Sequence, residues 1–121
     1  MKRLLLAVAL AALAGCDYGI DDIPASEVPE HPTFEADVRP LLHDHCTLCH
    51  GVPAKRGAPG GFRLDQYDDD EEGRSGARAK AGAIVKIVKD DEMPPAAEWG
   101  DGIGPNGKKL LERWLADGAP R

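Results

Sequence analysis

The feature that most restricts this chain is the segment Cys46-x-x-Cys49-His50. Two cysteines three positions apart, followed at once by a histidine, form the attachment signature of a c-type haem. Each thiol can add across one vinyl group of the porphyrin, and a short helical turn brings both sulfurs to the same edge of the ring. The imidazole then projects beneath the ring centre, where it can ligate iron. The segment therefore predicts one covalent haem c, attached at Cys46 and Cys49, with His50 as an axial ligand.

Two other chemistries compete for this segment. A Cys-x-x-Cys pair can be a dithiol redox centre, but such a centre usually lies in a βαβ context, which the sequence does not indicate. A zinc site could combine both cysteines with His43, His45 and His50. Structural zinc sites, however, usually draw their ligands from two separated pairs. The pattern therefore favours haem, with zinc and dithiol chemistry as the alternatives.

The size and charge of the chain limit what else it can be. Its 121 residues are enough for one small domain. It carries 15 basic and 21 acidic residues, a net charge of −6, and therefore lacks the basic excess that nucleic-acid binding requires. A domain of this size often needs a covalent or metal staple. A covalent haem would provide one, as the largest apolar group in the core.

The first 15 residues have the pattern of an export signal. Lys2 and Arg3 precede an apolar run over 4–13, which is too short to span a bilayer. The run leads into a Leu-Ala-Gly-Cys sequence that ends at Cys16 and resembles a bacterial lipobox. We therefore expect a lipoprotein signal peptide over 1–15, lipid attachment at Cys16, and a location on the periplasmic side of a bacterial membrane. An ordinary signal with an incidental cysteine is the alternative.

Residues 16–32 are expected to form a tether between the anchor and the domain. They are acidic, contain three prolines and lack apolar periodicity, which is typical of an extended spacer. The domain itself would then cover 33–121. With Cys16 assigned to lipid, and Cys46 and Cys49 to haem, all three cysteines of the chain are accounted for.

The first expected helix begins near Thr33, a residue that suits an N-cap. Its apolar positions recur at helical spacing up to Cys46, and Pro40 should kink it or start a second segment. His43 and His45 lie on this helix. They are expected to face solvent or the haem propionates rather than to ligate iron.

Two further helices are expected. Ser75 could cap the middle one, whose apolar stripe runs through residues 81–88. The last helix should begin at Pro105 and stop at Gly118. The members of its apolar face are Gly107, Leu110, Leu111, Trp114 and Leu115.

Met93 is the candidate for the second axial ligand. It is the only methionine left after removal of the signal peptide, and it precedes Pro94 and Pro95, which favour an extended backbone. Its thioether is a soft ligand, and paired histidine and methionine ligands raise the reduction potential of a haem. The alternative is a methionine that fills a gap in the core.

Residues 68–72 are five consecutive acids. A solvated loop is the simpler interpretation of such a run. The alternative is a patch on which a redox partner with a basic docking face could bind.

Residues 33–121 resemble a class I cytochrome c domain, specifically the planctomycete-type cytochrome c domain. The residues that carry the resemblance are Phe34, Val38, Pro40, Leu42, Cys46, Cys49, His50, Gly51, Gly60, Gly61, Arg63, Leu64, Asp65, Met93, Pro94, Pro95, Trp114, Gly118 and Ala119. The resemblance implies an all-α fold, with three or four helices around one covalent haem and crossing N- and C-terminal helices. It also implies that His50 and Met93 ligate the iron.

The function expected from these features is that of a membrane-anchored monohaem cytochrome c, which passes single electrons between protein partners and is not an enzyme. A filled sixth iron position argues against substrate chemistry at the metal. Two alternatives remain. One is a haem sensor or peroxidase-like module in which Met93 is displaceable. The other is a subunit that serves as the electron outlet of a larger dehydrogenase.

Overall fold

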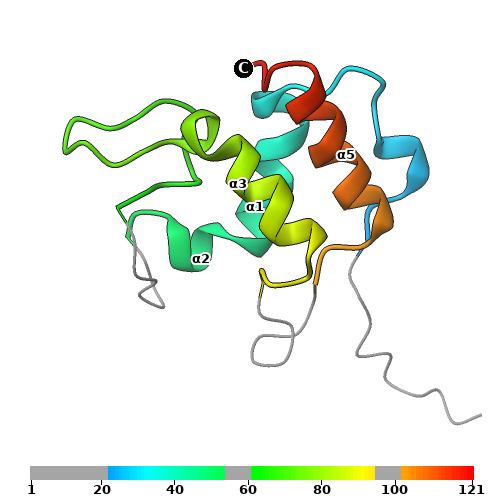
Figure 1. Cartoon of the computed structure of the whole chain (residues 1–121), viewed down its shortest axis with the longest axis horizontal. Helices are drawn as coiled ribbons and strands as arrows, with labels where there is room; N and C mark the ends of the chain where they lie inside the picture. The colour runs from blue at the N-terminus through cyan, green and yellow to red at the C-terminus, as the bar shows by residue number, and fades with distance from the viewer. Residues whose placement is uncertain (1–21, 54–60, 95–101) are drawn as a thin grey trace, which may run out of the picture.

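The structure, a computed structural model, describes residues 22–53, 61–94 and 102–121 (Figure 1). Its helical elements are η1 (Ala25–Glu27), η2 (Phe34–Val38), α1 (Arg39–His45), α2 (Thr47–His50), α3 (Ala77–Lys89) and α5 (Pro105–Ala116). The described ranges contain no β-strand, only an isolated bridge between Phe62 and Ser75. This part of the chain is therefore all-α, as the sequence predicts. The predicted signal peptide and Cys16 lie outside the described residues.

The chain enters its first helical run through a reciprocal cap at Thr33. The Thr33 hydroxyl accepts the Ala36 N–H at 3.4 Å, and the Thr33 N–H donates to the Asp37 carboxylate at 2.8 Å. The run opens as a single π-helical stretch, η2, and continues as α1 from Arg39, with Pro40 in the first turn of α1. A proline is tolerated there because the first N–H groups of a helix have no partner within it. Where the sequence predicts a kink or a second segment, the run therefore changes from π-helix to α-helix at Arg39, without a break.

The core forms where η2, α3 and α5 meet. Phe34 and Trp114 are completely buried, with their ring centroids 6.2 Å apart, and Tyr67 lies 5.4 Å from Phe34. The Tyr67 hydroxyl donates to the Ala119 carbonyl at 2.7 Å, so the polar end of this ring is satisfied inside the core. The other buried apolar side chains come mainly from α1, α3 and α5: Val38, Leu41, Leu42, Leu64, Ala77, Ala81, Ile84, Val85, Val88, Ile103, Leu110 and Leu111.

The ends of α3 and α5 follow the expected pattern only in part. Helix α5 begins at Pro105 and ends before Gly118, whose φ of +84° suits glycine, as predicted. Helix α3 begins one residue later than a Ser75 cap implies, because Gly76 is its N-cap and donates its N–H to the Asp69 carboxylate at 2.9 Å. A side chain on Gly76 would collide with the neighbouring backbone, so the tight approach decides where the helix starts.

Leu115 departs from the predicted apolar face of α5. It is 37% exposed, whereas Leu110, Leu111 and Trp114 are buried. The apolar pattern of a helix locates its buried face, but the width of that face depends on which elements pack against it.

The segment 22–32 differs most from expectation, because it packs on the domain instead of extending away from it. Ile23 and Val28 contact the core, and Pro32 is fully buried. Arg113 of α5 donates to the carbonyls of Val28 and Pro29 at 3.3 and 2.9 Å. Residues 22–32, predicted as part of the tether, therefore pack against the helical domain.

No helix among the described residues is long and apolar enough to cross a membrane.

Candidate functional site

Helix α2 places the two thiols and the imidazole of the motif on one helical turn. The Cys46 N–H donates to the Leu42 carbonyl at 2.7 Å, which ties this turn to α1. The Cys46 carbonyl then accepts the N–H groups of Cys49 and His50, at 3.1 and 2.8 Å. Both cysteines are free thiols. The structure thus places both cysteines and His50 within one helical turn, as the spacing of the motif predicts.

The Cys46 thiol is held in its protonated form. Burial raises the pKa of Cys46 to about 12, and the nearby Cys49 adds to the rise. Redox-active dithiols and zinc ligands are instead thiolates, whose pKa is lowered by positive neighbours or by the metal. The surroundings of Cys46 therefore do not favour the dithiol alternative.

The zinc alternative also lacks a ligand set in the described part of the chain. No three His, Cys, Asp or Glu side chains of residues 22–53, 61–94 and 102–121 converge closely enough to hold a metal ion. His43, one of the proposed zinc ligands, is exposed and lies 3.1 Å from the Asp44 carboxylate. His45 is half-buried on the same helix.

His50 is supported on one side by the short segment that contains Phe62 and Leu64. Its ring stacks on Phe62, with centroids 4.5 Å apart and an interplanar angle of 22°. Its carbonyl accepts the Leu64 N–H at 2.7 Å. Burial lowers the pKa of His50, which keeps the imidazole neutral over a wider pH range. Neutral imidazole is the form that ligates metals.

Helix α3 supports both parts of the predicted ligand set. Near its start, the Lys80 ammonium lies 5.5 Å from the Phe62 ring centroid, beside the His50 stack. Just beyond its end, the Met93 N–H donates to the Ile87 carbonyl at 3.3 Å. Lys80 and Ile87 are seven residues apart, which is about 10 Å along a helix. Figure 1 shows α2 and the yellow segment after α3 along the same lower edge of the molecule.

Met93 is not a core residue. Its side chain is 40% exposed, and Val52, two residues after His50, is 48% exposed. These are two of the three large apolar side chains that stay exposed among the described residues, the third being Leu115. The exposure does not support the gap-filling interpretation of Met93. It leaves the sulfur available as a ligand, and the pairing of Met93 with His50 on one iron stays a prediction.

The donor set therefore fits a covalent haem. Two free thiols lie on one turn, an imidazole whose pKa is lowered by burial follows them directly, and exposed apolar side chains occupy the adjoining segments. Pro95, the second proline after the methionine, lies outside the described residues, as does the segment 54–60.

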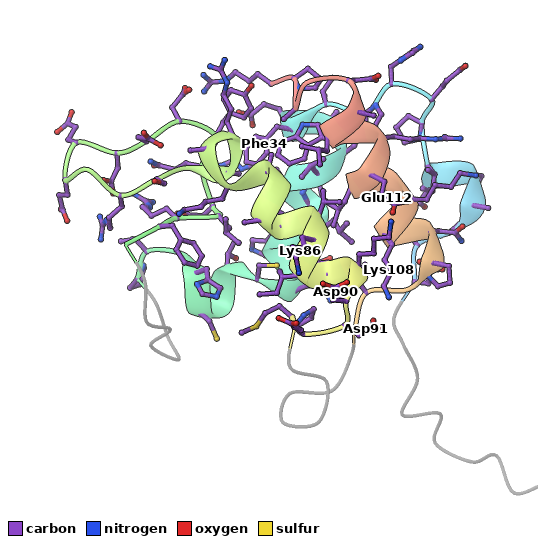
Figure 2. All side chains as sticks on the ribbon, viewed as in Figure 1. Phe34, Lys86, Asp90, Asp91, Lys108 and Glu112 are labelled. Carbon is purple, nitrogen blue, oxygen red and sulfur yellow. The ribbon has the colours of Figure 1, made fainter. Side chains whose placement is uncertain are left out.

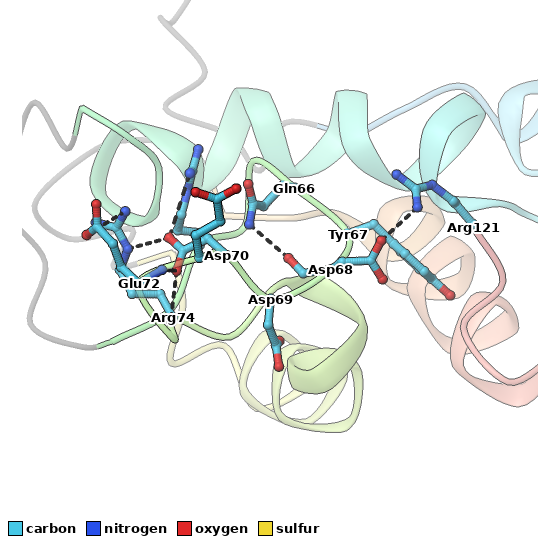
Figure 3. Close-up of a pocket in the computed structure, with 10 residues that line it drawn as sticks. Gln66, Tyr67, Asp68, Asp69, Asp70, Glu72, Arg74 and Arg121 are labelled. Atoms are coloured by element: carbon cyan, nitrogen blue, oxygen red, sulfur yellow. Dashed lines mark hydrogen bonds and ion pairs between the residues drawn. The ribbon is translucent and has the colours of Figure 1, made fainter.

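The predicted acidic loop contains a structural centre that sequence reasoning missed. An open cavity of about 470 Å³ is lined by residues of this loop together with Arg63, Tyr67 and Arg121 (Figure 3). The Asp70 carboxylate accepts the N–H groups of Glu72 and Arg74 and the Arg74 guanidinium, and only 8% of its side chain is exposed. Its partial burial raises the pKa of Asp70, but the hydrogen bonds from Arg74 outweigh this and lower the pKa overall.

Residues 68–72 are thus neither uniformly solvated nor one continuous patch. Asp68 pairs with Arg121 at 2.7 Å, and Asp69 is engaged by the Gly76 N–H. Glu71 and Glu72 are exposed. Asp70 and Arg74 lie in a turn and not in a helix, so the pairing rule for helical residues four apart does not predict this contact.

No protein-family model, no curated protein and no solved structure matches this chain. The candidate site therefore rests on the motif and on its local geometry.

Proposed function

We propose that this protein is a monohaem c-type cytochrome of class I fold, anchored by lipid at Cys16 to a bacterial membrane and carrying single electrons on its periplasmic side. The observation that carries the proposal is the α2 turn, which presents two free thiols and a neutral imidazole together. Its haem c would supply the one-electron iron couple.

The residues of the chain have separate tasks in this proposal. Cys46 and Cys49 would hold the haem covalently, while His50 and Met93 would ligate its iron. The Phe62 stack and the hydrogen bond from the Leu64 N–H restrict movement of His50. A ligand held in place in both oxidation states keeps the reorganisation that accompanies electron transfer small.

One observation favours a second candidate, a haem sensor with a displaceable methionine. Met93 is 40% exposed, so few protein contacts oppose the movement of its side chain. Binding of carbon monoxide to the ferrous protein separates the two candidates. A carrier should bind it slowly or not at all, whereas a sensor should bind it rapidly.

The test of the proposal is covalent haem attachment. The full-length gene would be expressed in a bacterial host with its c-type haem maturation system, and haem would be detected on denaturing gels and by intact mass. We expect one haem per chain. The double variant Cys46→Ala/Cys49→Ala should lose it completely, while the control Val52→Ala, exposed beside the motif, should keep it. A parent protein that is exported but never gains the mass of a haem would contradict the proposal.

A further inference from the structure

The segment that follows the predicted lipid anchor is held against α5 along the whole length of that helix. We name residues 22–32 the strap. At the start of α5, the Asp22 carboxylate accepts the N–H groups of Asn106 and Gly107, at 3.1 and 3.0 Å. The Asn106 amide donates back to the Ile23 carbonyl at 3.0 Å. Gly104 is buried against Asp22, where any side chain would collide with it.

The other end of the strap is secured near the end of the same helix. Arg113 donates to the carbonyls of Val28 and Pro29, and His31 pairs with Asp117 at 3.0 Å. Buried Pro32 then leads into the core. These contacts lie at both ends of the strap and at its middle, so the strap is fixed as a unit and not at one point.

The docked strap shortens the link between anchor and domain. Six residue steps separate Cys16 from Asp22, which span at most about 20 Å. If the strap were free up to Thr33, the link would have 17 steps and could span about 60 Å. A domain of about 100 residues has a radius of gyration of roughly 13 Å. Such a domain is roughly 30 Å or more across, so the short link is shorter than the domain is wide and restricts which end of the domain can face the bilayer.

The end of the domain that contains Asp22 also contains the segment with Met93. Asp22 caps the first turn of α5, and Lys108 in that turn pairs with Asp91 at 2.6 Å, just after α3 (Figure 2). Met93 follows two residues later, within about 7 Å of chain. A short series of contacts thus connects the attachment point of the link to the predicted axial ligand.

We propose that the strap holds the Met93 end of the domain toward the membrane, so that the protein exchanges electrons with a partner resident in that same membrane rather than with one that diffuses freely. This inference rests on the lipid anchor of the proposed function. The docked strap excludes the long-reach tether that the sequence suggests. A partner in bulk solution would have to approach the Met93 end through the narrow space between the domain and the bilayer.

The test measures which end of the domain faces the lipid. Nitroxide spin labels would be placed at Lys109→Cys, exposed in the first turns of α5, or at Glu71→Cys, in the exposed acidic loop. Figure 1 shows that loop at the opposite end of the long axis from the strap. The lipidated full-length proteins would be bound to vesicles with and without a nickel-chelating lipid. The added relaxation caused by nickel reports proximity to the membrane surface, and the comparison removes any effect of the haem iron.

We expect nickel to relax the label at position 109 several-fold more than the label at position 71. In the strap-release variant Asp22→Ala/Arg113→Ala the two values should become nearly equal, while circular dichroism confirms that the helices persist. Equal relaxation of both labels in the parent protein would overturn the inference and leave the haem proposal intact. The control Cys16→Ala should leave the vesicles. If the parent also fails to bind vesicles, the anchor is wrong and the inference falls with it, whereas haem attachment is judged separately on gels.

Discussion

The strap and α5 on one side, and the α2 turn with the Met93 segment on the other, are stabilised in different ways. On the α5 side, Trp114 and Phe34 are fully buried and the helix start is capped by a carboxylate. On the α2 side, Met93 and Val52 stay exposed and each segment is held by a few backbone hydrogen bonds. In the first region, the apolar side chains named here are buried, and the N–H groups at the start of the helix have hydrogen-bond partners within the chain.

The second region leaves its apolar groups Met93 and Val52 exposed and its thiols and imidazole partly exposed. Two free thiols and the His50 imidazole lie on the α2 turn, which packs on α1, and the exposed Met93 thioether lies just beyond the end of α3. Groups that pack fully against protein gain stability but are no longer available to a cofactor. The difference indicates that the stabilising contacts and the exposed side chains lie on different sides of this small domain.

The largest expected effect lies in the packed region. Trp114→Ala should reduce the free energy of unfolding by about 3–5 kcal/mol, because it removes a fully buried aromatic side chain and leaves a cavity. Its neighbour Leu115→Ala, which is 37% exposed, should cost less than about 1 kcal/mol. Chemical denaturation of the haem-containing protein would measure both. Similar losses for the two variants would contradict the assignment of Trp114 to the packed core and of Leu115 to the surface of α5.

In the accessible region, Met93→Ala should change the chemistry more than the stability. Its exposed side chain contributes little packing, so we expect helicity and covalent haem to be retained. Loss of the sulfur should lower the reduction potential, remove the weak far-red band of ferric iron bound to methionine, and allow carbon monoxide to bind.

The control for this prediction is Val52→Ala. Its reduction potential and visible spectrum should match those of the parent protein. If Met93→Ala instead keeps the band and the potential and refuses carbon monoxide, another residue is the sixth ligand. His31, His43 and His45 would then be the candidates.

A smaller effect is expected from Asp70, which organises the acidic loop. Asp70→Asn should lower the melting temperature at pH 7, because the ionised carboxylate accepts hydrogen bonds from Arg74. The pKa of Asp70 is lowered in the folded state, so its stabilising contribution is present above its ordinary value of 3.8 and is lost as the pH falls through the folded value. The difference between parent and variant should therefore shrink in acid.

Glu71→Gln is the matched control for Asp70, since Glu71 is exposed in the same loop. It should leave the melting temperature nearly unchanged at every pH. A gap between Asp70→Asn and the parent that persists at pH 2 would show that the carboxylate charge is not the source of the stability.

The smallest expected effect is that of the negative electrostatic field at the protein surface on the rate of electron transfer. Removal of Lys2 and Arg3 with the signal peptide leaves 13 basic and 21 acidic residues, a charge of −8. Electron transfer to a partner with a basic docking face should slow as salt rises, because the attraction is screened over about 8 Å at physiological ionic strength. Stopped-flow rates across a salt series would measure this. A flat profile would mean that the acidic side chains do not guide the partner.

Local signals in the sequence were sufficient for much of the fold. The Thr33 cap and the limits of α5 at Pro105 and Gly118 were predicted and observed, and the helix type changes next to Pro40, where a kink or a second segment was predicted. Each depends on a residue whose backbone preference acts within a few positions of the chain. The Cys46-x-x-Cys49-His50 motif is local in the same sense, since one helical turn contains it.

What only the tertiary structure decided involves residues far apart in the chain. Asp22 caps α5 by accepting the N–H groups of Asn106 and Gly107, which lie 84 and 85 residues later in the chain. No local sequence pattern predicts that contact. The exposure of Leu115 depends on which elements reach that side of α5. A polar segment with prolines has no strong preference of its own, so the partners supplied by the folded domain determine whether it extends or docks. For this reason the sequence alone predicted a tether for residues 22–32. The structure shows that these residues pack along α5.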